Sequence, residues 1–124
     1  MKRVLIAEDE PNIVISLEFL LKEAGYHVSV ARDGLQALAL AGELRPDLIV
    51  LDVMLPALNG FDVCRRIRGD GAAKGAKVLM LTARGRESEI ARGMDAGADA
   101  YMTKPFATRE LIKVVAELLA SPTG

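Results

Sequence analysis

The amino-acid sequence predicts an α/β fold, a doubly wound five-stranded parallel sheet of strand order 2-1-3-4-5 with five helices. Along the whole chain, short apolar runs alternate with longer segments in which apolar residues recur at helical spacing. Three of the runs are continuous and rich in Leu, Ile and Val, which is typical of strands buried on both faces. Strict alternation of the two patterns favours a parallel sheet covered by helices on both faces, and right-handed crossovers leave few other topologies.

Each expected strand is a short apolar run, and each expected helix carries an apolar stripe. The strands are expected at residues 4–7, 27–30, 48–51, 78–81 and 100–102. In chain order, the helical stripes are Ile13, Leu17, Leu20 and Ala24; Leu35, Leu38, Ala41 and Leu44; Phe61, Cys64 and Ile67; Ile90 and Met94; and Leu111, Val114 and Leu118.

Residues with special backbone preferences mark the helix boundaries. Pro11 suits the first turn of a helix, where its missing N–H costs no hydrogen bond. Gly25 is typical of the left-handed residue that follows a helix, and Asp33 of an N-cap. Arg45-Pro46 is expected to end the second helix, because the residue before a proline disfavours the α conformation.

The length of 124 residues suits one compact domain, which we place at residues 1–120. Residues 121–124 are expected to be the chain end or the start of a linker. Hydrophobic residues make up 51% of the chain, and this content excludes a disordered protein. The net charge of −1 lacks the basic excess of nucleic-acid-binding domains, so we expect no direct nucleic-acid binding.

Cysteine content and hydropathy indicate where the protein works. The single Cys64 cannot form an internal disulfide, which suits the reducing cytoplasm. The apolar run after the basic N-terminus is too short for a signal peptide, and no run approaches the roughly 20 residues of a membrane span. We therefore expect a cytoplasmic protein without membrane contact.

Polar residues interrupt the apolar pattern where the expected strands end. Glu8 and Asp9 follow the first strand, Asp52 the third, Thr82 lies at the end of the fourth, and Lys104 follows the fifth. In a parallel sheet these ends share one edge, and open α/β sheets bind ligands beyond that edge, where the strand order reverses. With the first and third strands about 4.8 Å apart, the three carboxylates are expected in one small pocket.

Three neighbouring carboxylates need compensating positive charge to stay ionised. A divalent cation and the ammonium of Lys104 are the two candidates. Oxygen-only ligands with room for water favour Mg²⁺ over Zn²⁺, and Mg²⁺ held by few carboxylates usually binds phosphate oxygens. A carboxylate can itself be the nucleophile and form an aspartyl-phosphate, so the pattern indicates phosphoryl chemistry.

Four stretches of the sequence resemble the receiver domains of two-component response regulators, which have a flavodoxin-like fold. They are Ala7-Glu8-Asp9-Glu10, Leu51-Asp52-Val53-Met54-Leu55-Pro56, Leu81-Thr82-Ala83 and Tyr101-Met102-Thr103-Lys104-Pro105-Phe106. The resemblance covers essentially the whole chain, with all four motifs in order and at suitable spacing.

The resemblance implies a phosphoacceptor and a metal site. Asp52 is the expected phosphoacceptor, in a reaction that needs Mg²⁺ as the cofactor. Asp9 and Asp52 are expected to bind Mg²⁺, with Glu8 acting through water and the backbone carbonyl of Met54 completing the protein ligands. Glu8 stands where the family more often has Asp.

The resemblance also implies how a phosphoryl group is held and sensed. Lys104 is expected to pair with the phosphoryl oxygens and Thr82 to donate its hydroxyl to them. Tyr101 is then expected to swing inward into space that Thr82 vacates, so that both residues form a switch. The peptide bond before Pro105 is expected to be cis.

The implied partner is a sensor histidine kinase or a phosphotransfer protein that presents a phosphohistidine. The protein is then no enzyme in the usual sense, because it catalyses only its own phosphorylation and dephosphorylation. The face of the fourth helix, fifth strand and fifth helix is the expected output and a possible homodimer surface. Its charged residues, which otherwise suggest a solvated surface, are Arg84, Arg86, Glu87, Glu89, Arg92, Arg109, Glu110 and Lys113.

Three other functions were weighed against this one. Aspartyl-phosphate phosphatases place an acidic residue two positions after the nucleophile, where this chain has Met54. A flavodoxin-like cofactor carrier needs small polar residues in its first loop, where Glu8, Asp9 and Glu10 repel a phosphate. A receiver-like interaction module that works without phosphorylation is the remaining alternative.

Overall fold

The computed structural model describes residues 1–69, 75–83 and 87–120, and it contains a five-stranded parallel sheet. The strand order is β2-β1-β3-β4-β5, which confirms the doubly wound class and the order expected from the sequence. The elements follow one another as β1 (Arg3–Ala7), α1 (Pro11–Glu23), β2 (His27–Ala31), α2 (Gly34–Leu44), β3 (Leu48–Asp52), α3 (Gly60–Gly69), β4 (Lys77–Ala83), α4 (Glu87–Ala96), β5 (Ala100–Lys104) and α5 (Thr108–Ala120). The expectation for residues 121–124 lies outside the described residues.

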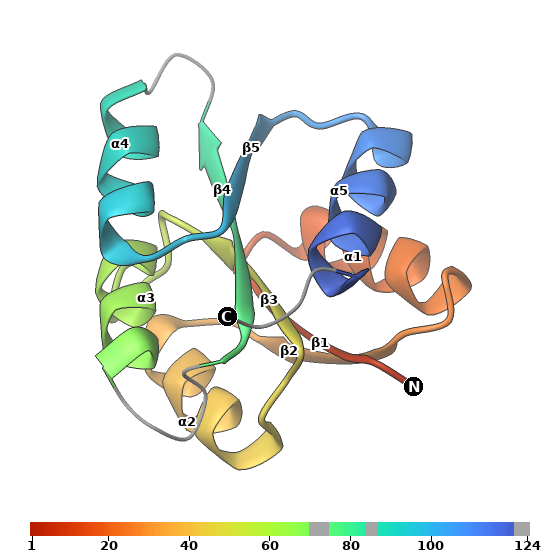
Figure 1. The fold of residues 1–124 in the computed structure, drawn as a ribbon, viewed down its shortest axis with the longest axis horizontal. Coiled ribbons are helices and arrows are strands. Elements are labelled where there is room, and N and C mark those ends of the chain that lie inside the picture. The colour runs from red at the N-terminus through yellow and green to blue at the C-terminus, as the bar shows by residue number, and fades with distance from the viewer. Residues whose placement is uncertain (70–74, 84–86, 121–124) are drawn as a thin grey trace.

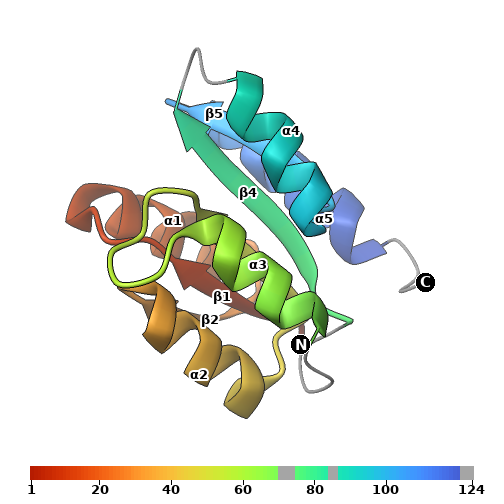
Figure 2. The same ribbon diagram turned by 90° about the vertical axis from the view of Figure 1, so that its left-hand side faces the viewer.

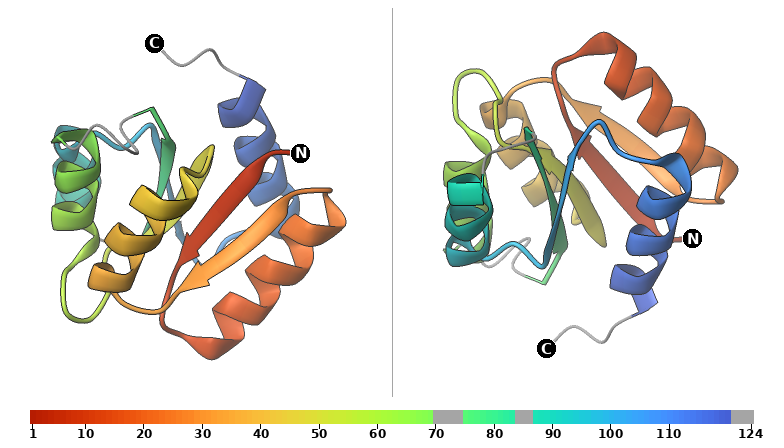
Figure 3. Two further views of the ribbon diagram at one scale, coloured as in Figure 1. Left: turned by 90° about the horizontal axis from the view of Figure 1, so that it is seen from below. Right: turned by 90° about the horizontal axis from the view of Figure 1, so that it is seen from above.

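Two helix layers enclose the sheet. Helices α1 and α5 lie against one face, and α2, α3 and α4 cover the other (Figures 1 and 2). Viewed from below and from above, the same two layers flank the sheet (Figure 3). Alternate residues of each inner strand enter the two cores: Leu5 packs towards α2 and α3, and Ile6 packs towards α1 and α5. All five residues of β3 are buried, as expected for a central parallel strand.

The helix boundaries follow the local chemistry of the sequence. Pro11 is the first residue of α1, and Gly25, two residues after the end of that helix, has a φ of +95°. The N-cap of α2 is Asp33, whose Oδ1 accepts a hydrogen bond of 2.7 Å from the N–H of Gln36. Arg45 adopts a left-handed conformation directly after α2, at the predicted stop.

In α1, α2 and α4 the buried residues coincide only in part with the apolar stripes expected from the sequence. In α1 the buried residues are Val14, Leu17 and Leu21, so only Leu17 of the expected stripe is fully buried. Leu35 of α2 is 56% exposed and Met94 of α4 is 45% exposed. Helices α1 and α2 carry apolar residues around much of their circumference, so spacing alone selects no single face in them. The angle at which each helix crosses the sheet decides which side chains are covered.

No helix among the described residues combines the length and the apolar character needed to cross a bilayer.

Candidate functional site

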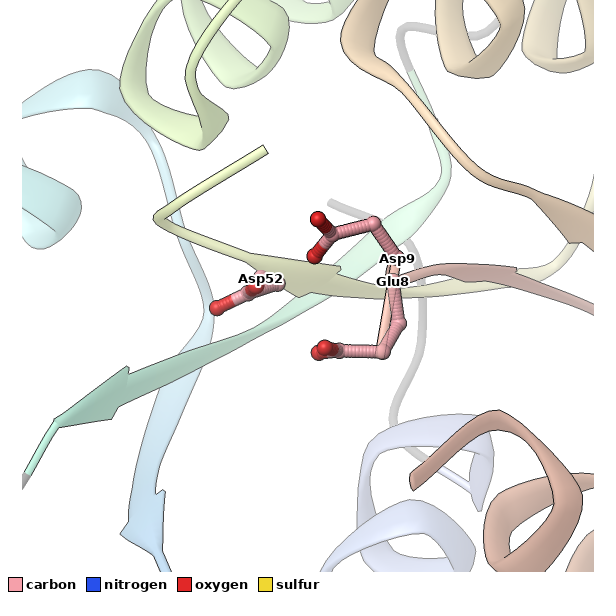
Figure 4. A group of neighbouring side chains, drawn as sticks. All are labelled: Glu8, Asp9 and Asp52. Atoms are coloured by element: carbon pink, nitrogen blue, oxygen red, sulfur yellow. The ribbon is translucent and has the colours of Figure 1, made fainter. Parts of the chain in front are cut away.

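The three carboxylates expected to share a pocket do so. Glu8 and Asp9 directly follow β1, and Asp52 is the last residue of β3. The two strands are paired, with Ala7 opposite Leu51, so the three acidic residues leave the same edge of the sheet. A carboxylate oxygen of each residue lies within 4.8 Å of the others. Figure 4 shows their side chains turned towards the same space beyond the ends of β1 and β3.

These carboxyl groups differ in their exposure to solvent. Glu8 is fully buried and Asp52 is 3% exposed, whereas Asp9 is exposed. The backbone holds Glu8 in place: its N–H donates to the carbonyl of Ala31, and its Oε1 accepts a 3.2 Å bond from the N–H of Glu10. Burial raises the pKa of Glu8, and the negative charge of Asp52 adds to that increase against the opposing effect of Lys104.

Lys104 supplies positive charge to this pocket from the edge strand β5. Its Nζ lies 3.0 Å from Oε2 of Glu8 and 3.2 Å from Oδ1 of Asp52. It also donates a hydrogen bond of 3.2 Å to Oε1 of Glu8. Burial alone would lower the pKa of Lys104, but its bond to Glu8 and the charge of Asp52 outweigh this effect and raise the pKa. The bond between Lys104 and Pro105 is cis.

Thr82 brings a buried hydroxyl to the same edge of the sheet. It is the penultimate residue of β4 and only 1% exposed. Within the described parts of the chain, its Oγ1 has no hydrogen-bond partner. An unsatisfied buried hydroxyl costs about 1–3 kcal/mol, and such groups call for a functional explanation. The hydroxyl therefore has a hydrogen bond to donate that no described group accepts.

Tyr101 and Met54 also lie at the surface. Tyr101 is 46% exposed and pairs with Met80 in the sheet, two positions before the Thr103 that pairs with Thr82. Met54 is 67% exposed and follows β3 by two residues, so its backbone lies in the loop next to Asp52.

Sequence reasoning missed two glycines beside the pocket. Gly34 opens α2 against the β3–α3 loop, and Gly60 opens α3 against the backbone of Asp52. Their signals in the sequence are the Asp33-Gly34 and Asn59-Gly60 pairs, of which only Asp33 was interpreted above, as an N-cap. The space around a glycine is a property of the packed structure, so its tightness could not be read from those pairs.

The charged residues expected on the output surface are only partly described. Arg84, Arg86 and the side chain of Glu87 lie outside the described residues. On α5, Arg109, Glu110 and Lys113 are exposed. Arg92 has a contact of its own, because its guanidinium carbon lies 4.3 Å from the centre of the Phe61 ring and so links α4 to α3.

Comparison with known proteins identifies the family. The family model of the response regulator receiver domain matches residues 4–116, and the chain belongs to this family of two-component signalling domains. The chain is 47% identical over 119 residues to the DNA-binding dual master transcriptional regulator RpaA of Synechocystis, covering 96% of this chain and 49% of that protein. It is 46% identical over 110 residues to the alkaline phosphatase synthesis transcriptional regulatory protein PhoP of Bacillus subtilis, covering 89% of this chain and 45% of that protein.

The chain thus spans about half the length of the curated relatives that it matches. Among solved structures, it is similar to the receiver domain of the sensor histidine kinase PA1611 of Pseudomonas aeruginosa, with a TM-score of 0.90 and 31% identity. The match covers 97% of this chain and 98% of that one, and that structure has a magnesium ion coordinated in its active-site cleft.

The residues of the pocket fit a hard divalent cation. Three carboxylates within 4.8 Å of one another supply oxygen ligands, and no described His or Cys joins this group. Oxygen donors of this kind suit Mg²⁺, which keeps part of its water shell and favours sites with few protein ligands. Burial and the nearby charge of Asp52 oppose the ionisation of Glu8, and a cation in the pocket would favour its charged form.

Proposed function

We propose that Asp52 accepts a phosphoryl group from the phosphohistidine of a sensor histidine kinase or phosphotransfer protein, in a Mg²⁺-dependent reaction. The observation that supports this proposal most directly is the grouping of Glu8, Asp9 and Asp52 within 4.8 Å, with Lys104 bridging two of them. A buried carboxylate at the end of a central strand, beside a cation, is placed to act as a nucleophile.

The transfer exchanges one bond to phosphorus for another. A carboxylate oxygen of Asp52 forms the new O–P bond while the N–P bond of the phosphohistidine breaks, and the released imidazole takes up a proton. Such transfers depend mainly on positioning and on neutralising the charge of the phosphoryl oxygens. Lys104 is suited to this task because its Nζ already lies 3.2 Å from Oδ1 of Asp52.

The proposed metal ligands are Asp9, Asp52 and the backbone carbonyl of Met54, with Glu8 acting through water. Bound Mg²⁺ would supply positive charge to the phosphoryl oxygens. The burial of Glu8 and the exposure of Asp9 support this division, since the exposed carboxylate faces the side from which a hydrated ion arrives.

Thr82 and Tyr101 form the proposed switch. A phosphoryl group on Asp52 would give the unpaired hydroxyl of Thr82 an acceptor, and this gain favours the conformation that brings the two together. Movement of Thr82 towards Asp52 frees space in which the exposed Tyr101 can be accommodated. The surface of α4, β5 and α5 then changes shape and serves as the output, with a homodimer as one form of it.

Hydrolysis of the phosphoryl group would return the domain to its unphosphorylated state. In this proposal the domain catalyses only its own phosphorylation and dephosphorylation. Two relatives that the chain resembles are named as DNA-binding or transcriptional regulators and are about twice its length. The proposal therefore gives DNA binding to another part of such a protein, not to this domain. A regulator of this kind works in the cytoplasm, where the chain's single Cys64 stays reduced.

The test uses acetyl phosphate as a small phosphodonor. Wild-type protein incubated with acetyl phosphate and Mg²⁺ should gain one phosphoryl group by intact-mass spectrometry, and chelation of Mg²⁺ should abolish the gain. Asp52→Asn should remain unlabelled, while Asp95→Asn, which changes an exposed carboxylate on α4, should label like wild type. Equal labelling of the Asp52 variant would reject Asp52 as the acceptor. An unlabelled wild type would favour the interaction module that works without phosphorylation.

A further inference from the structure

The β3–α3 loop, residues 53–59, is hydrogen-bonded to Gly34, the first residue of α2, and packs closely against it. The N–H of Gly34 donates a 3.0 Å hydrogen bond to the carbonyl of Pro56. A Cβ at position 34 would overlap the carbonyl oxygen of Leu58 and lie 2.7 Å from the carbonyl carbon and the Cβ of the same residue. Real Cβ contacts essentially never fall below 3.0 Å, and two of the three atoms met here are backbone. Only glycine therefore lets α2 approach this loop so closely.

The part of the loop that contacts Gly34, residues 56–58, has an unusual backbone conformation. Ala57 has a φ of +69°, a conformation that L-residues with a Cβ adopt rarely. The N–H of Leu58 donates 2.8 Å to the carbonyl of Pro56, which closes a γ-turn around Ala57. Such strained turns persist only where the surroundings determine them. The carbonyl of Pro56 accepts from both Leu58 and Gly34, so α2 is bonded directly to the turn.

The inner end of the same loop is bonded to β4 and to the first residue of α3. The N–H of Val53 donates 3.1 Å to the carbonyl of Leu81, and the N–H of Gly60 donates 2.9 Å to the carbonyl of Val53. A Cβ on Gly60 would lie 2.9 Å from Cα of Val53 and 3.0 Å from the carbonyl carbon of Asp52. The loop is thus held at both sides, and Met54 lies between the two attachments.

From this arrangement we infer that Gly34 is a positioning residue for the metal site, acting through the β3–α3 loop. It touches no carboxylate of the pocket. Its contact with Leu58 and its bond to Pro56 set how far the loop lies from α2, and this distance sets where the backbone of Met54 sits relative to Asp52. The inference rests on the proposed function, in which the Met54 carbonyl is a Mg²⁺ ligand. Substituting a residue that orients a metal ligand without binding the metal itself usually changes the metal affinity.

The test compares Gly34→Ala with Gly42→Ala in the absence of any phosphodonor. Both changes add one methyl group to α2, but a Cβ at position 42 meets no atom within 4 Å. Calorimetric titration with Mg²⁺ should show affinity weakened roughly tenfold in Gly34→Ala and unchanged in Gly42→Ala. The titration is run well below the Tm of each Mg²⁺-free variant, measured by circular dichroism, so a merely structural role would leave the affinity unaltered.

Two outcomes separate the inference from the function on which it rests. If folded Gly34→Ala binds Mg²⁺ as tightly as wild type, the inference is overturned while the proposed function stands. If wild type itself binds no Mg²⁺, the proposed function and the inference both fall.

If Gly34→Ala does not fold, the inference is tested instead by measuring amide hydrogen exchange of the wild-type protein with and without Mg²⁺. Coupling between two sites is reciprocal, so Mg²⁺ binding should slow exchange at the amide of Gly34 more than at that of Gly42. Equal changes at the two amides would overturn the inference.

Discussion

The Nζ of Lys104 lies 3.2 Å from Oδ1 of Asp52, although β4 separates the two strands that these residues end. The lysine reaches across the end of β4 and also contacts the fully buried Glu8. A single ammonium group therefore serves two carboxylates that would otherwise repel each other.

Lys104→Met is expected to destabilise the Mg²⁺-free protein by about 3 kcal/mol, because removing one partner leaves a buried charge uncompensated. Saturating Mg²⁺ should restore more stability to the variant than to wild type, since the ion then neutralises the carboxylates alone. Urea unfolding with EDTA or with Mg²⁺ measures both effects. Lys22→Met, which removes a pair with Glu18 at the surface of α1, serves as the control. Equal losses in the two variants would contradict this account.

Thr82→Val should leave the unphosphorylated protein as stable as wild type or raise its stability by about 1 kcal/mol, because an unpaired buried hydroxyl is replaced by a methyl group of similar shape. The variant should gain less stability than wild type from beryllofluoride, a phosphoryl mimic that would accept the hydroxyl's hydrogen bond. Thermal unfolding with and without the mimic provides the measurement. Thr103→Val, at the paired position of β5, should respond to the mimic like wild type. If Thr82→Val gains as much stability from beryllofluoride as wild type does, the Thr82 hydroxyl does not bind the phosphoryl group.

The raised pKa of Glu8 predicts how stability depends on pH in the absence of metal. Its carboxyl group holds a proton more tightly in the folded than in the unfolded protein, mainly because of burial. Its contribution to stability is therefore complete below the ordinary value of 4.5 and is lost as the pH rises through the folded-state pKa.

Glu8→Gln should remove that component. Unfolding free energies in EDTA, measured across the acidic range, should fall less steeply with rising pH in the variant than in wild type. A steeper dependence in the variant would show that the sign is wrong. Mg²⁺ requires the ionised carboxylate, so its affinity in wild type should decrease on acidification at a higher pH than for an ordinary glutamate.

Arg68, on α3, bonds to groups next to the first residues of β4 and β5, at the end of the sheet opposite the carboxylate pocket. Its Nε donates 2.9 Å to the carbonyl of Gly97, Nη1 bonds the carbonyl of Ala76, and Nη2 lies 2.6 Å from Oδ2 of Asp99. Arg68→Ala should lower the unfolding free energy by about 2–3 kcal/mol, since it leaves partly buried acceptors unsatisfied. Phosphorylation of the folded variant by acetyl phosphate should continue at the wild-type rate.

Arg66→Ala, which changes an exposed neighbour on the same helix, should be nearly neutral in the same urea titration. A loss of phosphorylation in folded Arg68→Ala would show that the Arg68 contacts and the carboxylate pocket, at opposite ends of the strands, are coupled.

The thiol of Cys64 should be unreactive in the native protein. It is fully buried in the core beneath α3, and burial raises its pKa. Because the thiolate is the reactive form, modification by a thiol reagent should be slow and should accelerate in step with urea unfolding. Rapid modification under native conditions would contradict the described packing.

The alternation of strands and helices and the acidic residues at the strand ends could be predicted from the sequence because both depend on short-range patterns. Continuous apolar runs require burial on both faces, and an acidic residue directly after such a run must lie at the sheet edge. The prediction that Glu8, Asp9 and Asp52 share one pocket is confirmed. Pro11 in the first turn of α1 and Asp33 as the N-cap of α2 were also predicted, since each depends on a single residue's local chemistry.

The buried faces of the helices were predicted less well. Leu35 and Met94 belong to apolar stripes but are largely exposed, whereas small residues such as Gly93 are buried. Close packing of a helix on a sheet favours small residues where the distance is shortest, and that distance is set by all the neighbouring elements together.

The alternation of strands and helices, the sheet end at which the polar residues gather, and the family motifs that they form can all be read from the amino-acid sequence. The packed fold is needed to see that Lys104 spans two carboxylates, that the hydroxyl of Thr82 has no described partner, and that Gly34 touches the loop beside Asp52. Local preferences act between neighbours in the chain, whereas these arrangements involve residues far apart in the sequence. Their distances follow from how all the elements pack at once.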